Sequence, residues 1–289
     1  MSIADADIFK DLDIYEGTGF FTIKEVPATG ANGVISAIDS DGNIMWSWHI
    51  WVFPYDLTPV TITNATGINY DIMPVYLATT YDDGDSTKRK NWFYQWGRPV
   101  PIVGPAAYDS ETNSAPPTTY GKLSYRLHDI CGSYQQGILN PTTMYLNAEE
   151  FEFWFPTDNP VYNLWDANCS ATGCSDNTTV KTVYDPSPVG FKVPNGNTFT
   201  GFSTSNIIGS FSNGYTFKKN SSDTTGIFFP VSGYRILGGN YISSGSFVWT
   251  SASTSEYSAT LLKFSTDKVE ATGRDRRYKA CSICCTADS

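Results

Sequence analysis

The residues of this chain that could do distinctive chemistry are its cysteines and histidines, and both are few. The two histidines, His49 and His128, are far apart, and the six cysteines are Cys131, Cys169, Cys174, Cys281, Cys284 and Cys285. An even number of cysteines permits disulfides without requiring them. Cys169 and Cys174 are the best candidate pair, because they lie in a polar, glycine-containing stretch (NCSATGCSDN) where a small ring is geometrically possible.

The C-terminal run CSICC presents thiols that could bind zinc or react. A zinc site would need further Cys or His ligands at typical spacing, and neither histidine is near in sequence. The adjacent Cys284 and Cys285 have arginines nearby that could lower a thiol pKa, but no histidine that could act as a base. The sequence therefore predicts no metal and no cofactor.

Other catalytic motifs are missing from the sequence. There is no G-x-S-x-G elbow, no H-E-x-x-H and no glycine-rich phosphate loop. The acidic stretch DDGD at 82–85 lacks the ligand spacing and closing Glu of an EF-hand, so a solvated loop is favoured. His49 is expected to be a partly covered, hydrogen-bonding residue. The chain is therefore predicted not to be an enzyme.

Composition narrows the class of protein further. Aromatic residues make up 15% of the 289 residues and charged residues 17%, against about 25% charged in typical domains. Gly, Ser, Thr, Asn and Tyr fill the difference, which is typical of extracellular β-rich proteins and of binding loops. The net charge of -10 would repel a nucleic-acid backbone, so no nucleic-acid partner is expected.

Targeting signals are not evident in the sequence. No apolar run approaches the roughly 20 residues of a spanning helix, so no direct membrane span is expected. The N-terminus MSIADADIFK is acidic and does not read as a signal peptide, which leaves a cytoplasmic protein or an exported one without its leader as the alternatives. The family resemblance described below favours export, with a leader that is not present in this sequence.

The pattern of residues predicts a mostly β, α+β protein. Residues 18–52 are predicted to be strands, with a tight turn at Asp41-Gly42, and 46–51 alternate as in a half-buried strand. The segment 146–155 is predicted to hold a short amphipathic helix. The rest consists of short strand-like runs between Gly, Pro and Asn. We expect an N-terminal β-hairpin segment (1–52) packed on a main domain (53–289).

A family resemblance runs from about residue 33 to the end. The ordered blocks DGNIMWSWHIWV, NWFYQWGR, KTVYDPSPVGFKVP, GIFFPVSGYR and FVWTSAS resemble the fimbrillin-associated adhesin domains of Bacteroides-type bacteria, which are related to the Fibrobacter succinogenes major paralogous domain. The resemblance implies a C-type-lectin-like fold with irregular insertions and few short helices. It also implies an extracellular protein at a pilus or the outer membrane, with two kinds of partner: pilus subunits, and a protein or glycan ligand on another cell or host surface.

The tail departs from the family pattern, since YKACSICC stands where relatives close with an aromatic-Gly-Phe-Ser-Val-Arg element. The same fold carries the variable proteins of diversity-generating retroelements, which rewrite adenine-containing codons near the C-terminus. The stretch 246–285 is rich in the residues that such rewriting produces. Our hypothesis is a diversified adhesin with a ligand-binding region there.

The predicted ligand-binding residues lie on one strand and the loops expected near it. Leu262 and Phe264 share one side of a strand, so Lys263 and Ser265 are expected on the solvent side. Tyr and Arg are frequent interface anchors. The predicted set is Ser253, Ser255, Glu256, Tyr257, Lys263, Ser265, Arg274, Asp275, Arg276 and Tyr278.

Four alternatives remain open at this point. An oxidase related to formylglycine-generating enzymes shares the expected fold, and would show turnover. A calcium-dependent lectin is less favoured, because the Glu-Pro-Asn, Gln-Pro-Asp and Trp-Asn-Asp triplets are missing. A phage receptor-binding protein or a purely structural pilus subunit would differ from an adhesin in upstream sequence and in binding behaviour.

Overall fold

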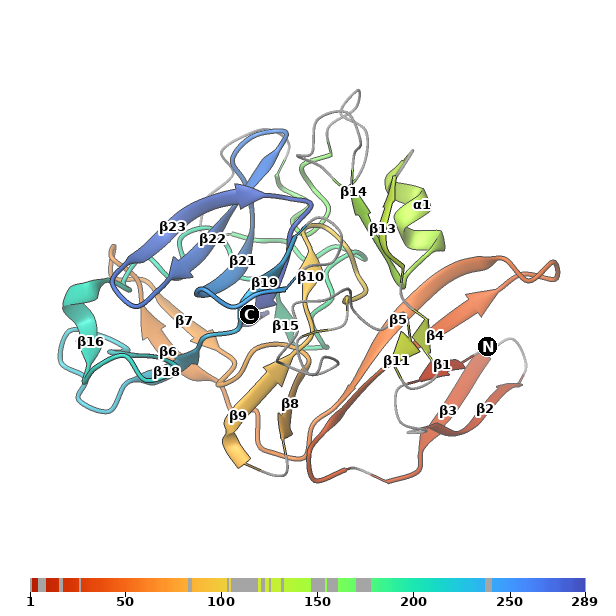
Figure 1. The fold of residues 1–289 in the computed structure, drawn as a ribbon, viewed down its shortest axis with the longest axis horizontal. Coiled ribbons are helices and arrows are strands. Elements are labelled where there is room, and N and C mark those ends of the chain that lie inside the picture. Colours follow the sequence, from red (N-terminus) through yellow and green to blue (C-terminus); the bar gives the residue numbers. More distant parts are fainter. Residues whose placement is uncertain are drawn as a thin grey trace.

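The computed structural model describes most of the chain (Figure 1). The described residues are 2–4, 9–15, 18–25, 27–82, 85–102, 104, 119–120, 123–124, 126–130, 133–146, 154, 161–169, 178–236 and 241–288. Cys131 and Cys174 fall outside them, as does nearly all of the segment 146–155. The helix predicted for that segment and the Cys169–Cys174 pairing therefore stay predictions.

The N-terminal strands form a small layered unit. They are β1 (Ser2–Ala4), β2 (Phe9–Tyr15), β3 (Thr18–Ile23), β4 (Ala31–Ile38) and β5 (Ile44–Val52). A three-stranded sheet has the order β1-β4-β5, and the hairpin β2–β3 packs on it around Phe9 and Ile35. Gly42 in the β4–β5 turn has φ +88, which glycine adopts without steric cost. The predicted hairpin with its Asp41-Gly42 turn is confirmed.

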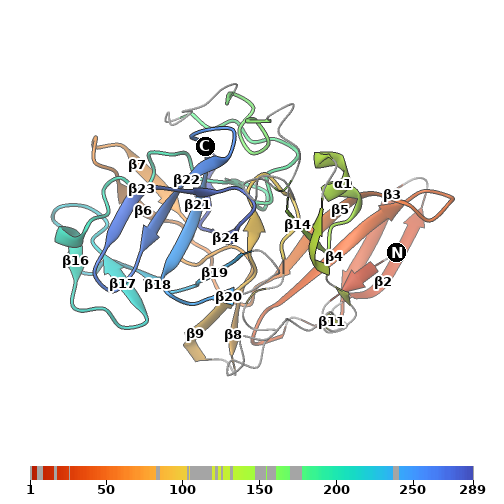
Figure 2. The same ribbon diagram turned by 45° about the horizontal axis from the view of Figure 1, so that its top comes forward.

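The main sheet is built almost entirely from the C-terminal third of the chain. Its order is β20-β19-β24-β21-β22-β23, with β10 also paired to β24. The strands are β10 (Tyr94–Gln95), β19 (Tyr234–Arg235), β20 (Tyr241–Ile242), β21 (Ser246–Ser253), β22 (Ser258–Phe264), β23 (Val269–Arg276) and β24 (Ala280–Ile283). Figure 2 shows β21, β22 and β23 side by side in the main body, with β2, β3, β4 and β5 at the other end of the molecule.

Smaller sheets surround the main sheet. One has the order β15-β25-β7-β6 and another β16-β17-β18, while β8–β9 and β11–β12 are antiparallel pairs and β13–β14 is parallel. The strands are β6 (Val60–Thr63), β7 (Asn69–Ile72), β8 (Thr79–Asp82), β9 (Asp85–Asn91), β11 (Thr119–Tyr120), β12 (Leu123–Ser124), β13 (Arg126–Ile130), β14 (Thr143–Leu146), β15 (Phe191–Lys192), β16 (Ile207–Ile208), β17 (Gly214–Phe217), β18 (Ile227–Pro230) and β25 (Thr286–Ala287).

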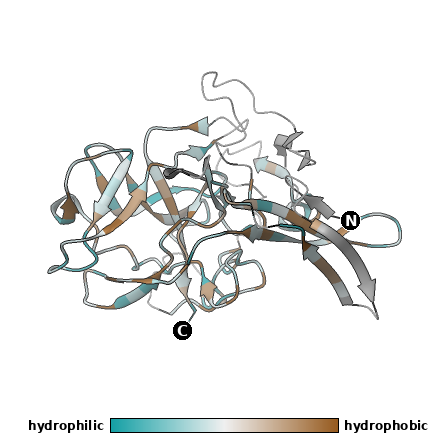
Figure 3. Ribbon diagram, turned by 90° about the horizontal axis from the view of Figure 1, so that it is seen from below, coloured by the Kyte–Doolittle hydropathy of each residue, from teal (hydrophilic) through white to brown (hydrophobic). Residues whose placement is uncertain are grey.

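Strand β21 lies between two hydrophobic cores. All eight of its residues are buried. Trp249 belongs to the first core, which also holds Trp92, Trp96 and Trp165, whereas Val248 belongs to the second. Alternation along a strand sends neighbouring side chains to opposite faces, so a strand with no exposed residue must be covered on both faces. The hydropathy colouring in Figure 3 shows hydrophobic and hydrophilic residues alternating along several other strands.

The second core is a cluster of aromatic rings under the main sheet. Phe202 and Phe217 stack with centroids 4.4 Å apart, and Phe229 meets Phe202 edge to face at 5.3 Å. Such arrangements contribute about 0.5–1.5 kcal/mol per pair beyond the burial of area. The short strands expected in FSNGYTF and GIFFPV are confirmed as β17 and β18, whereas NTFTGF, also expected to be strand-like, forms turns whose aromatic residues pack on these strands.

A single short helix is present among the described residues besides the 3-10 turn η2 (Thr204–Asn206). Helix α1 (Tyr134–Leu139) is capped by Ser133, whose hydroxyl accepts from the Gln136 N–H at 3.3 Å. The buried Arg98 donates to the carbonyl of Gly137 at 2.8 Å and to the carbonyl of Thr143, and so ties α1 to β14. The sequence did not predict this helix.

The coarse fold prediction is confirmed, since the described part of the chain is mostly β with little helix. The N-terminal sheet packs on the main body through Val34 and Trp51, which join the first core. Within the described ranges, no helix has the length and apolar character needed to span a membrane.

Replacing Trp249 tests the role of β21. Its indole N–H donates to the Tyr94 carbonyl at 3.0 Å, in a fully buried site. Trp249→Phe should cost about 1–3 kcal/mol through the lost hydrogen bond and the smaller ring, and Trp249→Ala about 3–5 kcal/mol through the cavity. Guanidinium unfolding measures both. A loss below about 0.5 kcal/mol for the alanine variant would contradict burial on both faces, because surface substitutions fall in that range.

Candidate functional site

Two aromatic rings, tilted by 47° to each other, lie together with two lysines on the first-core face of the main sheet. The rings of Tyr234 and Phe247 have centroids 4.1 Å apart. The Lys279 Nζ lies 4.9 Å from the centre of the Tyr234 ring, and the Lys263 Nζ lies 5.1 Å from that of Phe247. With Asp275 and Tyr278 these residues form what we call the platform: Tyr234, Phe247, Lys263, Asp275, Tyr278 and Lys279.

Strand register explains why the platform residues share a face. Phe247 of β21 pairs with Lys263 of β22, and Ala259 of β22 pairs with Asp275 of β23. Paired residues point to the same side of a sheet, and residues two apart in a strand do so as well. Lys263 and Asp275 therefore project from the side of Ala259 and Leu261, which pack in the first core.

Charges on the platform are paired but partly accessible. The Lys279 Nζ lies 2.6 Å from the Asp275 Oδ1, with side-chain exposures of 16% and 11%. Burial alone would lower the pKa of Lys279, but its bond to Asp275 raises that pKa above the usual value. Lys263 and Glu270 are 4.0 Å apart and more exposed. A ligand can therefore replace Glu270 as the partner of Lys263 more easily than it can replace Asp275 as the partner of Lys279.

The platform tyrosines keep their protons at neutral pH. Burial raises the pKa of Tyr234 and of Tyr278 above the usual value. Their hydroxyl groups therefore remain hydrogen-bond donors as well as acceptors. Aromatic rings with polar ends and nearby cations supply contact area and hydrogen bonds with few rotatable bonds, as binding surfaces require.

The C-terminal thiols are unsuited to nucleophilic chemistry. Cys281, Cys284 and Cys285 are free and buried. Burial raises the pKa of each, that of Cys285 to about 12, so the thiols stay protonated. Cys284 lies in the second core and Cys285 in the first, because adjacent residues of an extended chain point to opposite sides.

The turn 254–257, between β21 and β22, is fixed by the buried Arg277. Its guanidinium donates to the carbonyls of Ser255 at 2.6 Å and Val161 at 2.8 Å, and lies 4.3 Å from the centre of the Trp96 ring. Burial lowers its pKa to about 9, which still leaves it charged at neutral pH. The turn therefore has a defined position next to the sheet.

The structure brings together part of the predicted ligand-binding set. Lys263, Asp275 and Tyr278 belong to the platform, and Ser255, Glu256 and Tyr257 lie on the adjoining turn. Arg274 and Arg276 are exposed, but alternate with Asp275 and so lie on the other face of β23. Ser265 lies in the β22–β23 turn and donates to the Asp267 carboxylate at 3.0 Å.

The prediction that Ser253 binds ligand on an exposed face is wrong, because this residue is fully buried. Its hydroxyl lies 3.3 Å from the Cys169 sulfur. The sequence argument treated only the Leu262 side of the sheet as core. Cys169 and Thr179 cover the other face at this point, where the Thr179 and Ser251 hydroxyls are 3.0 Å apart.

Three platform residues, Tyr234, Phe247 and Lys279, were missed from sequence. Tyr234 lies in the block GIFFPVSGYR, which carries part of the family resemblance, and Arg235 next to it is fully buried. The sequence did contain one signal for Lys279, its four-residue separation from Asp275. The turn between β23 and β24 brings these two oppositely charged side chains together.

No group of His, Cys, Asp or Glu side chains suited to hold a metal ion occurs within the described ranges. Cys169 is disulfide-bonded, while the other member of the predicted pair lies outside those ranges. A comparison with protein-family models, curated proteins and solved structures finds no match for this chain.

His49 is a neutral structural group between the N-terminal sheet and the first core. The Asn32 amide nitrogen donates to the Ala78 carbonyl at 3.0 Å, so its oxygen accepts from the His49 Nε2–H at 2.9 Å. The Tyr94 hydroxyl then donates to Nδ1, also at 2.9 Å. Both ring nitrogens are occupied, as expected of a hydrogen-bonding residue, and burial lowers the pKa of His49 to about 3.

Stability should consequently fall on mild acidification. The unfolded chain binds a proton at His49 below about pH 6.5, whereas the folded protein does not until about pH 3, so folding stability is lost as pH falls through this window. For this one group, the free energy of unfolding can fall by at most about 1.4 kcal/mol per pH unit. Guanidinium unfolding at pH 7 and pH 5 should show a smaller loss for His49→Gln than for the unaltered protein. Equal losses would contradict the neutral, buried state.

Proposed function

We propose that this chain is a non-enzymatic, cell-surface adhesin that binds a protein or glycan ligand through the platform and the adjoining turn 254–257. The observation that carries the proposal is the contact between the tilted rings of Tyr234 and Phe247, with a lysine over each ring. Aromatic rings beside cations are a frequent composition of binding sites. Here Tyr234 and Lys263 are partly exposed, whereas Phe247 is buried. The sheet beneath the platform is rigid, because β21 and β24 are fully buried.

A C-type-lectin-like fold is part of this proposal. Supporting it are the mostly β architecture, the few short helices and the family resemblance of the sequence blocks. The disulfide at Cys169 supports an extracellular location, since disulfides persist mainly in oxidising compartments. We place the protein at a pilus or outer membrane, with pilus subunits as further partners.

The proposed diversification applies to fewer positions than the stretch 246–285. The hydroxyl groups of Ser246, Thr250 and Ser251 bond within the core, to Tyr76, to the Thr260 carbonyl and to Thr179. Substitution there would leave buried polar atoms without partners, which costs about 1–3 kcal/mol each. Variable positions are therefore expected on the platform, the turn 254–257 and the exposed face of β23.

Ligand screening with matched variants tests the binding proposal. Immobilised glycans and purified host-surface proteins are the probes, and the expected result is saturable binding that EDTA does not change. Tyr278→Ala should weaken binding by about thirtyfold, as an anchor residue does. Lys263→Ala should weaken it by a smaller factor. Lys218→Ala, beyond β17 on the other side of the second core, is the control and should leave affinity unchanged.

Three outcomes would contradict this proposal. Binding that survives both platform variants would place the ligand elsewhere. Loss of binding in EDTA would point to a calcium-dependent site. Self-association without affinity for any immobilised probe would favour a purely structural subunit.

A further inference from the structure

The segment 263–279, which runs from the end of β22 through β23 to the turn before β24, is basic in an acidic chain. It contains six basic and three acidic residues, whereas the whole chain has a net charge of -10. Arg277 is buried and acts inside the protein. Arg274 and Arg276 on β23 are exposed. These two arginines therefore place positive charge at the surface of an otherwise acidic protein.

Arg274 and Arg276 lie on one face of β23. Arg274 pairs with Thr260 of β22, and Arg276 lies two positions further along the strand. Residues two apart point to the same side and are about 7 Å apart along the strand. Asp275 between them points to the other side, where its Oδ1 lies 2.6 Å from the Lys279 Nζ. The intervening carboxylate is thus held by a lysine on the opposite face.

The outer edge of β23 is open in the described part of the chain. β23 is the last strand of the main sheet, on the side of β22 away from β21 (Figure 1). Among the described helices and strands, only β22 packs closely against it. Within the described ranges, no backbone hydrogen bond from a segment other than β22 reaches residues 269–275. The eight residues of β23 offer about 26 Å of strand edge.

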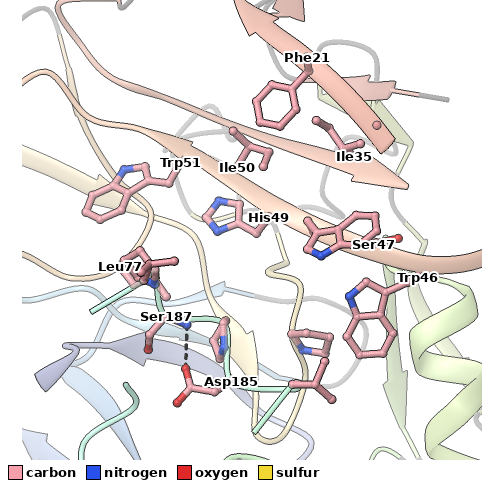
Figure 4. A pocket seen from close by; sticks show the side chains of 17 residues that line it. Phe21, Ile35, Trp46, Ser47, His49, Ile50, Trp51, Leu77, Asp185 and Ser187 are labelled. Atoms are coloured by element: carbon pink, nitrogen blue, oxygen red, sulfur yellow. Dashed lines mark hydrogen bonds between the residues drawn. The ribbon is translucent and has the colours of Figure 1, made fainter. Parts of the chain in front are cut away.

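The last strand of the N-terminal sheet, β5, differs because it is covered. Helix α1 packs against β5, and the Tyr184 ring lies 5.7 Å from the Trp46 ring. Figure 4 shows Trp46 and Trp51 of β5 among the side chains that line the cleft between this strand and the segment 183–189. β5 therefore offers no free edge to a further strand, whereas β23 does.

The two arginines decide which segment fits the edge of β23. Charged side chains on an edge discourage pairing with most other strands, while opposite charges on neighbouring strands stabilise a pair and like charges destabilise it. Acidic residues at every second position of an extended segment repeat at about 7 Å, which is the spacing of Arg274 and Arg276. A guanidinium group can bind a carboxylate through two parallel hydrogen bonds. The edge thus matches an acidic strand and disfavours apolar or basic ones.

We propose that the outer edge of β23 binds an extended acidic segment of a partner protein, whose carboxylates at alternate positions pair with Arg274 and Arg276. Main-chain hydrogen bonds to β23 supply affinity, and the arginines select the charge of the segment. The arginines project from the face of β23 opposite to the platform. The proposal therefore does not rest on the function proposed for the platform.

A labelled eight-residue peptide of alternating Thr and Glu tests the strand-edge proposal by fluorescence anisotropy. We expect saturable binding to the full chain that weakens as salt is added, because the paired charges are exposed. A peptide of four Glu followed by four Thr has the same composition and charge without the alternation, and should bind about tenfold more weakly. Equal binding of both peptides, or binding of neither, would overturn the proposal.

Charge-reversal variants locate the binding. Arg274→Glu and Arg276→Glu should each weaken binding of the alternating peptide by about tenfold. Lys24→Glu, at an exposed lysine just after β3, makes the same change of charge on the N-terminal sheet and should leave binding unchanged. Binding that survives both arginine substitutions would place the peptide elsewhere, against the proposal.

A charge swap separates recognition from any structural effect of these substitutions. The double variant Arg274→Glu, Arg276→Glu should bind a peptide of alternating Thr and Lys, which the unaltered chain should not bind. Failure of this rescue would contradict paired charges at the edge of β23. Self-association of the chain that the double variant loses would identify the occupant as a second copy, and equal affinity for polygalacturonate would identify it as an acidic glycan, both against the proposal.

Discussion

Burial of β21 on both faces is the constraint on which the rest of this structure depends. A strand without a solvent face needs a packed layer on each side, and the chain provides two. The tryptophan-rich first core covers Trp249, and the phenylalanine-rich second core covers Val248. The segments that supply these layers come from residues 34 to 285, so this one strand connects the main body with the N-terminal sheet.

The same constraint decides where a ligand can be bound. Both faces of β21 are covered, and its serines and threonines are used for internal hydrogen bonds. Charged side chains reach the surface farther along the sheet, at Lys263 and Glu270 and on the outer face of β23.

The sequence predicted local structure better than it predicted exposure. The alternation in MWSWHIWV and the Asp41-Gly42 turn are local signals, and both led to the correct hairpin. Ser253 was placed on the surface because strand alternation cannot reveal that a loop more than seventy residues earlier covers the second face. Tyr234 was missed for the converse reason, since a GYR block gives no sign that its arginine is buried while its tyrosine reaches the platform.

The most direct measurement is deep sequencing of codons 246–285 across clones that carry related chains. The account predicts substitutions at adenine-containing codons of the platform, the turn 254–257 and the exposed positions of β23, such as Tyr257, Lys263 and Arg274. It predicts that the buried codons of β21 and β24 stay constant. Uniform conservation of the whole stretch, or substitutions spread equally over buried and exposed positions, would contradict a diversified ligand-binding face.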